Sequence, residues 1–216
     1  MDGFSTIVRF FQEGGLFMYF ILGIFAVGLA IAIERFIYLS VAKAGSRKTW
    51  NGMVPLLQSG SIDQALELAN SSKAAIGHML AYGLQRIKDR AKHRSEVETA
   101  MEEGLMEVIP RLEKRTHYLA TLANIATLMG LLGTIIGLIQ AFTAVSAADP
   151  SQKADLLSQS ISVAMNTTAF GLMAAIPLLL AHAFLTTKTT ELVDSFEMAA
   201  VKFLNLISKK SSGPNS

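Results

Sequence analysis

Hydrophobic residues are gathered in three long, almost uncharged runs, at Leu16–Ile33, Leu119–Ala148 and Ile161–Thr187. A helix rises about 1.5 Å per residue, so about 20 residues are enough to cross a hydrocarbon core of about 30 Å. The pattern therefore predicts an all-α integral membrane protein with three transmembrane helices. With their interfacial ends, these helices are expected at 16–40, 118–148 and 159–187.

The polar sequence after the first run, residues 41–117, is predicted to form a helical cytoplasmic domain. Two segments fit the capping box, in which a hydroxyl and a carboxylate or amide bind free backbone N–H groups at a helix start. They are Ser61-Ile62-Asp63-Gln64 and Ser95-Glu96-Val97-Glu98. Helices are therefore expected to begin near Ile62 and near Glu96.

The second membrane helix is predicted to be long, with one half in the cytoplasm. An apolar stripe at steps of three and four residues leads into the second run. Its members are Val97, Met101, Leu105, Val108 and Leu112. Pro110 removes a backbone hydrogen bond, so it is expected to kink this helix without breaking it. The third helix is also expected to continue into the cytoplasm, where 188–216 form a C-terminal helix and, from Lys209, a disordered tail.

The distribution of positive charge sets the expected orientation. Residues 41–117 carry most of the Lys and Arg, whereas the short connection at 149–158 carries only Lys153. Because basic loops stay on the cytoplasmic side, the N-terminus is expected in the periplasm and the C-terminus in the cytoplasm. Residues 1–15 alternate apolar and polar side chains at helical spacing, which predicts a periplasmic interfacial amphipathic helix.

Composition narrows the choice of function. The chain is 51% hydrophobic with a mean hydropathy of +0.40, and its net charge of +2 reflects membrane topology rather than nucleic-acid binding. It has no cysteine, no phosphate loop and no metal-ligand spacing, so no cofactor is expected. Ser162 and His182 are separated by about 30 Å along one predicted helix, so they cannot form a nucleophile–base pair. The sequence therefore does not indicate an enzyme.

Small and hydroxyl residues mark the two later spans. Gly130, Gly133 and Gly137 lie near one face of the second, and Gly171 and Pro177 lie in the third. Small residues let a neighbouring helix backbone approach closely, so we expect helix packing there.

The third span also holds a polar cluster, and Thr127 and Thr134 share a face of the second. Polar groups are costly in hydrocarbon unless they pair or line a cavity, so the cluster should point inward. It can hold helices together, line an ion path, or do both. Its members are Ser162, Asn166, Thr167 and Thr168.

Charged and titratable residues are confined to the ends of the spans. His182 lies toward the inner end of the third and is expected to hydrogen-bond locally, with a proton relay as the alternative. Glu34 and Arg35 are expected to anchor the first helix at the membrane boundary. No span centre contains Asp, Glu, Lys or Arg. An ion path made from this chain alone would therefore have no fixed carboxylate.

Four stretches in and before the two later spans form a recognisable signature. They are Ile109-Pro110-Arg111-Leu112-Glu113, then Leu119-Ala120-Thr121-Leu122-Ala123-Asn124-Ile125-Ala126, then Gly130-Leu131-Leu132-Gly133-Thr134-Ile135-Ile136-Gly137, and Thr167-Thr168-Ala169-Phe170-Gly171-Leu172-Met173-Ala174-Ala175-Ile176-Pro177. In order, spacing and topology they resemble the ExbB/TolQ/MotA family of stator subunits, most closely ExbB and TolQ, and Glu34-Arg35 is also similar to the family.

The resemblance implies a homopentamer in the bacterial inner membrane, surrounding two copies of a single-span partner of the ExbD/TolR type. It implies pore threonines at Thr134 and Thr168, ions passing beside a partner aspartate, and a periplasmic effector of the TonB/TolA type, most often in TonB-dependent transport. Membrane lipid is the other expected partner.

One position departs from the family pattern. Five residues before Thr168, where ExbB-type proton channels often carry glutamate, this chain has Val163. The proton remains the expected ion, with sodium as the alternative, because the oxygens of Thr134, Thr167, Thr168 and Asn166 suit a hard cation bound transiently. A non-conducting structural scaffold is the alternative from another class.

Overall fold

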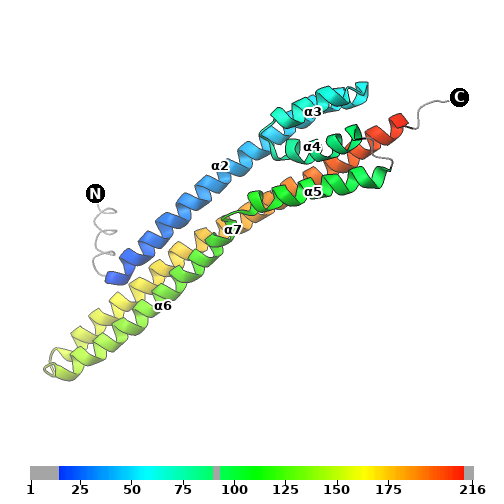
Figure 1. Ribbon diagram of the computed structural model, residues 1–216. Coiled ribbons are helices and arrows are strands. Elements are labelled where there is room, and N and C mark those ends of the chain that lie inside the picture. Colours follow the sequence, from blue (N-terminus) through cyan, green and yellow to red (C-terminus); the bar gives the residue numbers. More distant parts are fainter. Residues whose placement is uncertain (1–14, 90–92, 212–216) are drawn as a thin grey trace, which may run out of the picture. The chain divides into compact units, whose positions relative to one another are not determined.

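The computed structural model describes residues 15–89 and 93–211 (Figure 1). The described residues form helices and contain no strand, which confirms the predicted all-α class. The helices are α2 (Leu16–Ser59), α3 (Ile62–Ser71), α4 (Ala75–Lys88), α5 (Arg94–Glu113), α6 (Thr116–Ala147) and α7 (Lys153–Ser211). The interfacial helix expected at 1–15 lies almost wholly outside the described residues.

Three stretches are long and apolar enough to cross a membrane: Leu16–Ser59, Arg94–Ala147 and Lys153–Ser208. α7 begins inside the connection expected at 149–158, because the helix already starts at Lys153. It also runs to Ser211, three residues into the segment expected to be a disordered tail. The remaining tail residues, 212–216, are outside the described range.

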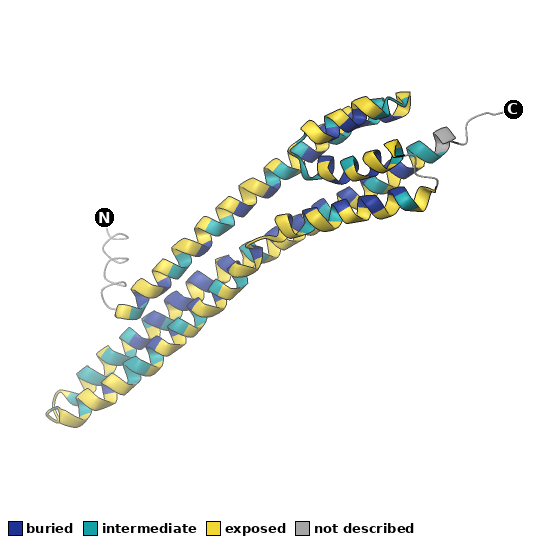
Figure 2. Cartoon of the chain, viewed as in Figure 1, coloured by how far each residue is buried: buried dark blue, intermediate teal, exposed yellow. Residues whose placement is uncertain are grey.

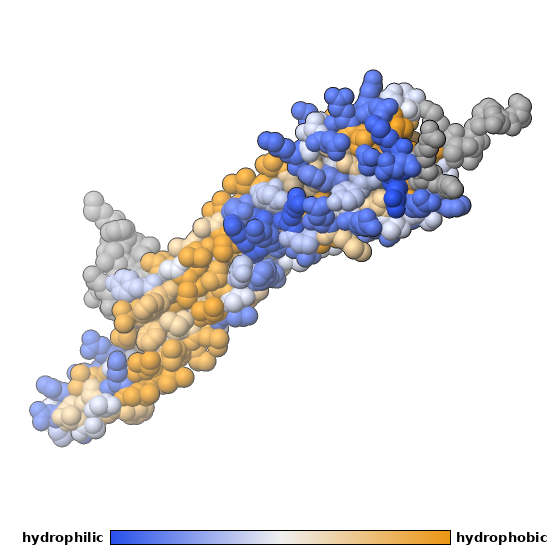
Figure 3. Space-filling model, in the orientation of Figure 1, coloured by the Kyte–Doolittle hydropathy of each residue, from blue (hydrophilic) through white to orange (hydrophobic). Residues whose placement is uncertain are grey.

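The chain divides into two compact units, Met1–Glu34 with Arg115–Phe184 and Arg35–Lys114 with Leu185–Ser216. In the first unit α6 and the apolar part of α7 lie side by side as an antiparallel pair (Figure 1). Its buried side chains are mostly small, while large apolar side chains cover the outside (Figures 2 and 3). Exposed examples on α6 are Leu128, Leu131, Ile135, Ile139 and Phe142. An apolar exterior over a small-residue core suits hydrocarbon or contact with other membrane helices.

The second unit has a conventional apolar core. Met79, Leu80 and Leu84 of α4 are fully buried, as are Phe196 and Phe203 of α7. Two glycines allow this packing. A Cβ at Gly83 would lie 3.2 Å from Phe203 Cε1, and one at Gly104 would lie 2.9 Å from Met79 Cα.

The predicted start of α3 is confirmed at Ile62, but the predicted capping interaction is wrong. The Ser61 hydroxyl makes no cap hydrogen bond and lies 3.0 Å from the Ser59 hydroxyl instead. The preceding turn explains this arrangement, because Gly60 adopts φ +79° and the N–H of Ser61 donates to the carbonyl of Leu56 at 2.9 Å. α5 likewise begins at Arg94, two residues before the expected Glu96, without a side-chain cap.

The expected uninterrupted second helix is also wrong in one detail. α5 passes through Pro110 without ending, and the break follows at Lys114 and Arg115, where Arg115 adopts φ +66°. Continuing the helix would pair the carbonyls of residues 111 and 112 with the N–H groups of residues 115 and 116.

The side chain of Arg35 takes over the carbonyls that this break releases. Its guanidinium donates to the carbonyl of Leu112 and, at 3.5 Å, to that of Arg111. Arg35 is 2% exposed and also lies over the Tyr38 ring at 4.5 Å. The expected boundary anchor is therefore a buried cap of α5, and its positive charge complements the helix dipole.

A candidate ion pathway between α6 and α7

Two threonine hydroxyls meet between α6 and α7. The Oγ1 atoms of Thr134 and Thr168 are hydrogen-bonded to each other. Thr134 Oγ1 also lies 3.2 Å from the carbonyl oxygen of Gly130 and 3.3 Å from that of Ala164. Thr168 Oγ1 donates to Gly130 O at 3.0 Å. Four neutral oxygens from two helices therefore converge in a segment that has no charged side chain.

Glycines bring the two helix backbones close enough for this contact. A Cβ at Gly171 would lie 2.8 Å from Ala126 O and 3.0 Å from the Cα of Gly130, so even alanine would force the helices apart. A Cβ at Gly137 would lie 3.0 Å from the Cβ of Ala164. The threonine pair thus depends on small residues placed on both sides of it along the helices.

Thr167 is directed differently from its neighbour Thr168. It is 2% exposed, its hydroxyl donates to Val163 O at 2.9 Å, and its methyl group lies where a Cβ on Gly133 would collide with it. Successive helix residues are about 100° apart, so adjacent threonines face different neighbours. Thr167 therefore packs its methyl group against α6 while its hydroxyl bonds back along α7.

Asn166 and Thr168 lie about 160° apart around α7, so one copy cannot present both to the same ion. Asn166 is half-buried, and its side chain has no hydrogen bond within the described ranges. The sequence indicated Thr134, Asn166, Thr167 and Thr168 as oxygen ligands of one ion, but of these four the structure brings only Thr134 and Thr168 together. The carbonyls of Gly130 and Ala164 join them, and sequence reasoning missed both, since every residue has a carbonyl. The only signal was a small residue opposite each threonine.

His182 does not belong to this pair. It lies fourteen residues beyond Thr168, about 21 Å along the helix, and its Nδ1 is 3.1 Å from the carbonyl oxygen of Thr116. That local bond matches the simpler of the two expectations. Ser162 is exposed and twenty residues from His182 on the same helix, so the two make no nucleophile–base pair within this chain.

These features define a multi-pass α-helical membrane protein with a neutral oxygen site between two of its helices. Residues 71–198, more than half of the chain, match the sequence model of the MotA/TolQ/ExbB proton channel family. The chain belongs to this family, which comprises channel subunits rather than enzymes.

Individual relatives agree with this assignment. The chain is 27% identical over 197 residues to a Methanothermobacter thermautotrophicus protein described as a biopolymer transport protein ExbB homolog, covering 90% of this chain and 68% of the relative. It is 30% identical over 114 residues to the Tol-Pal system protein TolQ of Haemophilus influenzae, covering 53% and 50%. It is 28% identical over 169 residues to the biopolymer transport protein ExbB of Pseudomonas putida, covering 70% and 49%. The chain thus spans about half the length of the last two.

Proposed function

We propose that this chain is the ion-conducting stator subunit of an inner-membrane motor of the ExbB–ExbD or TolQ–TolR type. The motor would couple the proton motive force to a periplasmic effector of the TonB type. The observation that carries the proposal is the hydrogen-bonded pair of Thr134 on α6 and Thr168 on α7, which lies within the apolar part of both helices. A hydroxyl both donates and accepts, so the pair can receive a proton on one side and release one on the other.

The charge needed for conduction would come from a partner. A bare proton or cation in hydrocarbon is costly, and four neutral oxygens offset that cost only in part. A single-span subunit of the ExbD/TolR type, with an aspartate at this depth, would supply the negative charge. In our proposal the partner lies inside a ring of copies of this chain, five by analogy with the family. The N-terminus would lie in the periplasm and the C-terminus in the cytoplasm.

A ring also accounts for the apolar exterior of the first unit. Ile139 is 60% exposed and Phe142 is 65% exposed on α6, and Met173 is 62% exposed on α7. Such side chains require lipid or other membrane helices around them. A stable monomer in native mass spectrometry, under mild detergent, would contradict the ring.

Sodium is the second candidate ion, and one observation favours it. The oxygens that meet at Thr134 and Thr168 are neutral, and Val163 stands where ExbB-type proton channels often carry a glutamate. Hydroxyl and carbonyl oxygens are the ligands that hard cations prefer. Measuring flux in vesicles against sodium, with potassium as the balancing ion, decides between the two. If flux does not depend on sodium, the partner aspartate is left as the proton carrier.

The threonine pair is tested by replacing hydroxyls at nearly constant shape. In vesicles that hold the chain with its partner, Thr134→Val and Thr168→Val should each reduce ion flux by about tenfold to a hundredfold, as expected for about 1–3 kcal/mol lost at an unsatisfied site. Thr143→Val is the matched control on α6, because the exposed Thr143 hydroxyl bonds to its own helix at Ile139 O, 2.9 Å away. Normal flux in both pair variants, with assembly intact, would contradict a role of the threonine pair in conduction. An absence of flux from the wild-type chain with its partner would leave the structural scaffold as the function.

A further inference from the structure

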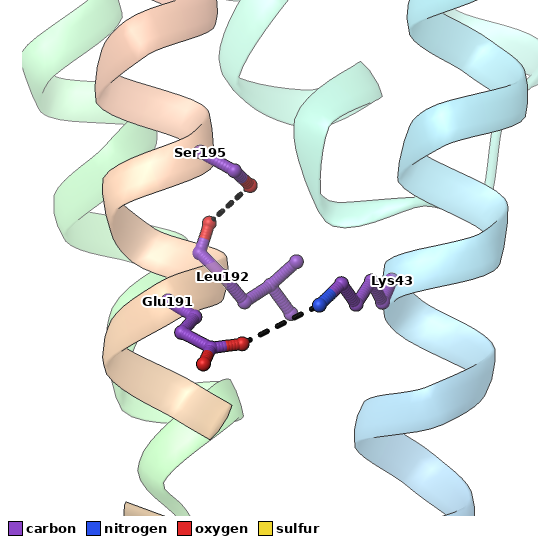
Figure 4. Close-up of polar contacts among 4 residues, drawn as sticks. All are labelled: Lys43, Glu191, Leu192 and Ser195. Carbon is purple, nitrogen blue, oxygen red and sulfur yellow. Dashed lines mark hydrogen bonds and ion pairs between the residues drawn. The ribbon is translucent and has the colours of Figure 1, made fainter. Parts of the chain in front are cut away.

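A cavity with a basic rim lies in the second unit between α2, α4 and α7, and we call it the basic groove. Its volume is about 270 Å³, and its walls are largely apolar. It is lined by Lys43, Ser46, Arg47, Trp50, Ile76, Leu192, Ser195, Phe196, Met198, Ala199 and Lys202. Figure 4 shows Lys43 reaching from α2 to Glu191 on α7, a contact of 3.4 Å beside Leu192 and Ser195. Arg47 and Lys202 have no ion pair with any residue the structure describes.

A smaller cavity in the same unit has the opposite charge, and we call it the acidic groove. It holds about 190 Å³ between α4, α5 and α7. It is lined by Met79, Glu98, Met101, Glu102, Leu105, Glu197, Ala200, Val201 and Leu204. The three glutamates are exposed, and none forms an ion pair with a side chain described at 15–89 or 93–208. Each groove therefore presents an apolar floor and unbalanced charge at its rim.

The two grooves lie on opposite faces of α7. At about 100° per residue, the α7 residues of the basic groove and those of the acidic groove centre about 170° apart around the helix. They also lie at nearly the same height. The basic groove uses α7 residues 192–202 and the acidic groove uses 197–204, so their midpoints differ by about 5 Å along the axis.

We infer that the basic groove of one copy of this chain docks against the acidic groove of the next copy. The inference rests on the ring in the proposed function and specifies which surfaces close it. A head-to-tail contact between two different faces forms a closed ring when the rotation closes. If α7 runs along the ring axis, rotation keeps every copy at the same height, so the two faces have to be nearly level; their midpoints differ by only about 5 Å.

The chemistry of the two faces is that of a protein interface. Apolar side chains form the centre, with Met198 57% exposed on the basic side and Val201 54% exposed on the acidic side, and charges form the rim. The hydroxyl of Ser46 is buried in the basic groove and lacks a hydrogen-bond partner among the described residues. A glutamate from the neighbouring copy would give it an acceptor. Lys43 already forms an ion pair with Glu191, so the cations available to the neighbouring copy are those of Arg47 and Lys202.

Disulfide trapping tests the contact directly, because the chain has no cysteine of its own. The full-length chain, with its partner in native membranes, is prepared as Arg47→Cys, as Glu102→Cys and as the double variant. Oxidation should give a ladder of covalent oligomers with the double variant and no cross-link with either single variant. Cross-linked dimers from a single variant would mean that like faces meet, and would overturn the inference.

Charge reversal provides the second test. Arg47→Glu with Lys202→Glu, or Glu98→Lys with Glu197→Lys, should weaken the ring at least about tenfold, and all four together should restore it. Lys73→Glu with Glu67→Lys is the control, since both residues are exposed and line neither groove. Intact rings in every variant, with no ladder, would overturn this interface and leave the proposed function standing. A wild-type chain that forms no ring would remove the proposed ring itself.

Discussion

Replacing Arg35 should open the junction between α5 and α6. The guanidinium is 2% exposed and holds the carbonyls of Leu112 and Arg111, the second at 3.5 Å. A hydrogen bond to a charged group contributes about 1.5–3 kcal/mol, and the longer contact contributes less. The stacking on Tyr38 adds about 0.5–1 kcal/mol. We therefore expect Arg35→Gln to destabilise the local structure by about 3 kcal/mol, because the buried carbonyl of Leu112 and the part-buried carbonyl of Arg111 lose their donor.

Trypsin offers a direct assay, because Lys114 and Arg115 at the break are themselves cleavage sites. Local opening that is easier by about 3 kcal/mol should raise the cleavage rate there by about a hundredfold under brief, limiting digestion. Arg111→Gln is the control for charge, since Arg111 forms an exposed pair with Glu107 that is worth under about 1 kcal/mol. Equal cleavage rates in wild type and Arg35→Gln would refute the capping role.

Three further outcomes test other parts of the structure. Gly171→Ala should destabilise the α6–α7 pair by about 1–3 kcal/mol through overpacking, whereas Gly23→Ala should not, because nothing lies within 4 Å of a Cβ there; thermal unfolding in detergent measures both. The hydrogen bond to Glu107 raises the pKa of Tyr82 above 10.0, so this contact stabilises the fold below pH 10 and is lost as pH rises through the folded-state pKa. Thermal unfolding of Tyr82→Phe should therefore lack the loss of stability that ionisation of Tyr82 causes at alkaline pH. A cysteine at Ser151 should react with an impermeant thiol reagent from outside the cell and one at Ser95 only after the membrane is opened, and the reverse pattern would invert the proposed orientation.

The membrane helices could be predicted from the sequence because hydrocarbon requires nearly every side chain of a span to be apolar. Length and the absence of charge are enough to identify such a helix, and all three were found. The close approach of α6 and α7 was also readable, since glycines at the contact are a local feature of the sequence. The hydrogen-bond partners of the threonine hydroxyls could be predicted only in part, because the direction of each side chain depends on how its helix is rotated about its axis.

The break at Arg115 could not be predicted in the same way. A non-glycine residue at positive φ is unfavourable, so local preference argued for a continuous helix. The compensating contact comes from Arg35, which is 77 positions away from Leu112. A pattern within one segment cannot reveal an interaction of that range. For the same reason the capping boxes were misleading at Ser61, where the preceding glycine turn had already set the helix start.

The proposed ion site and the two grooves each require a contribution from another chain, for separate physical reasons. Four converging neutral oxygens do not neutralise an ion in hydrocarbon, so the site between Thr134 and Thr168 needs a charge from another chain. The grooves carry unbalanced charge of opposite sign on opposite faces of α7, so each needs a neighbour. The proposed ring of copies would meet the second need and would create a central space in which a charged partner helix could meet the first. The proposal therefore links assembly to ion conduction, and a variant that loosens the grooves should reduce ion flux without altering any residue of the threonine pair.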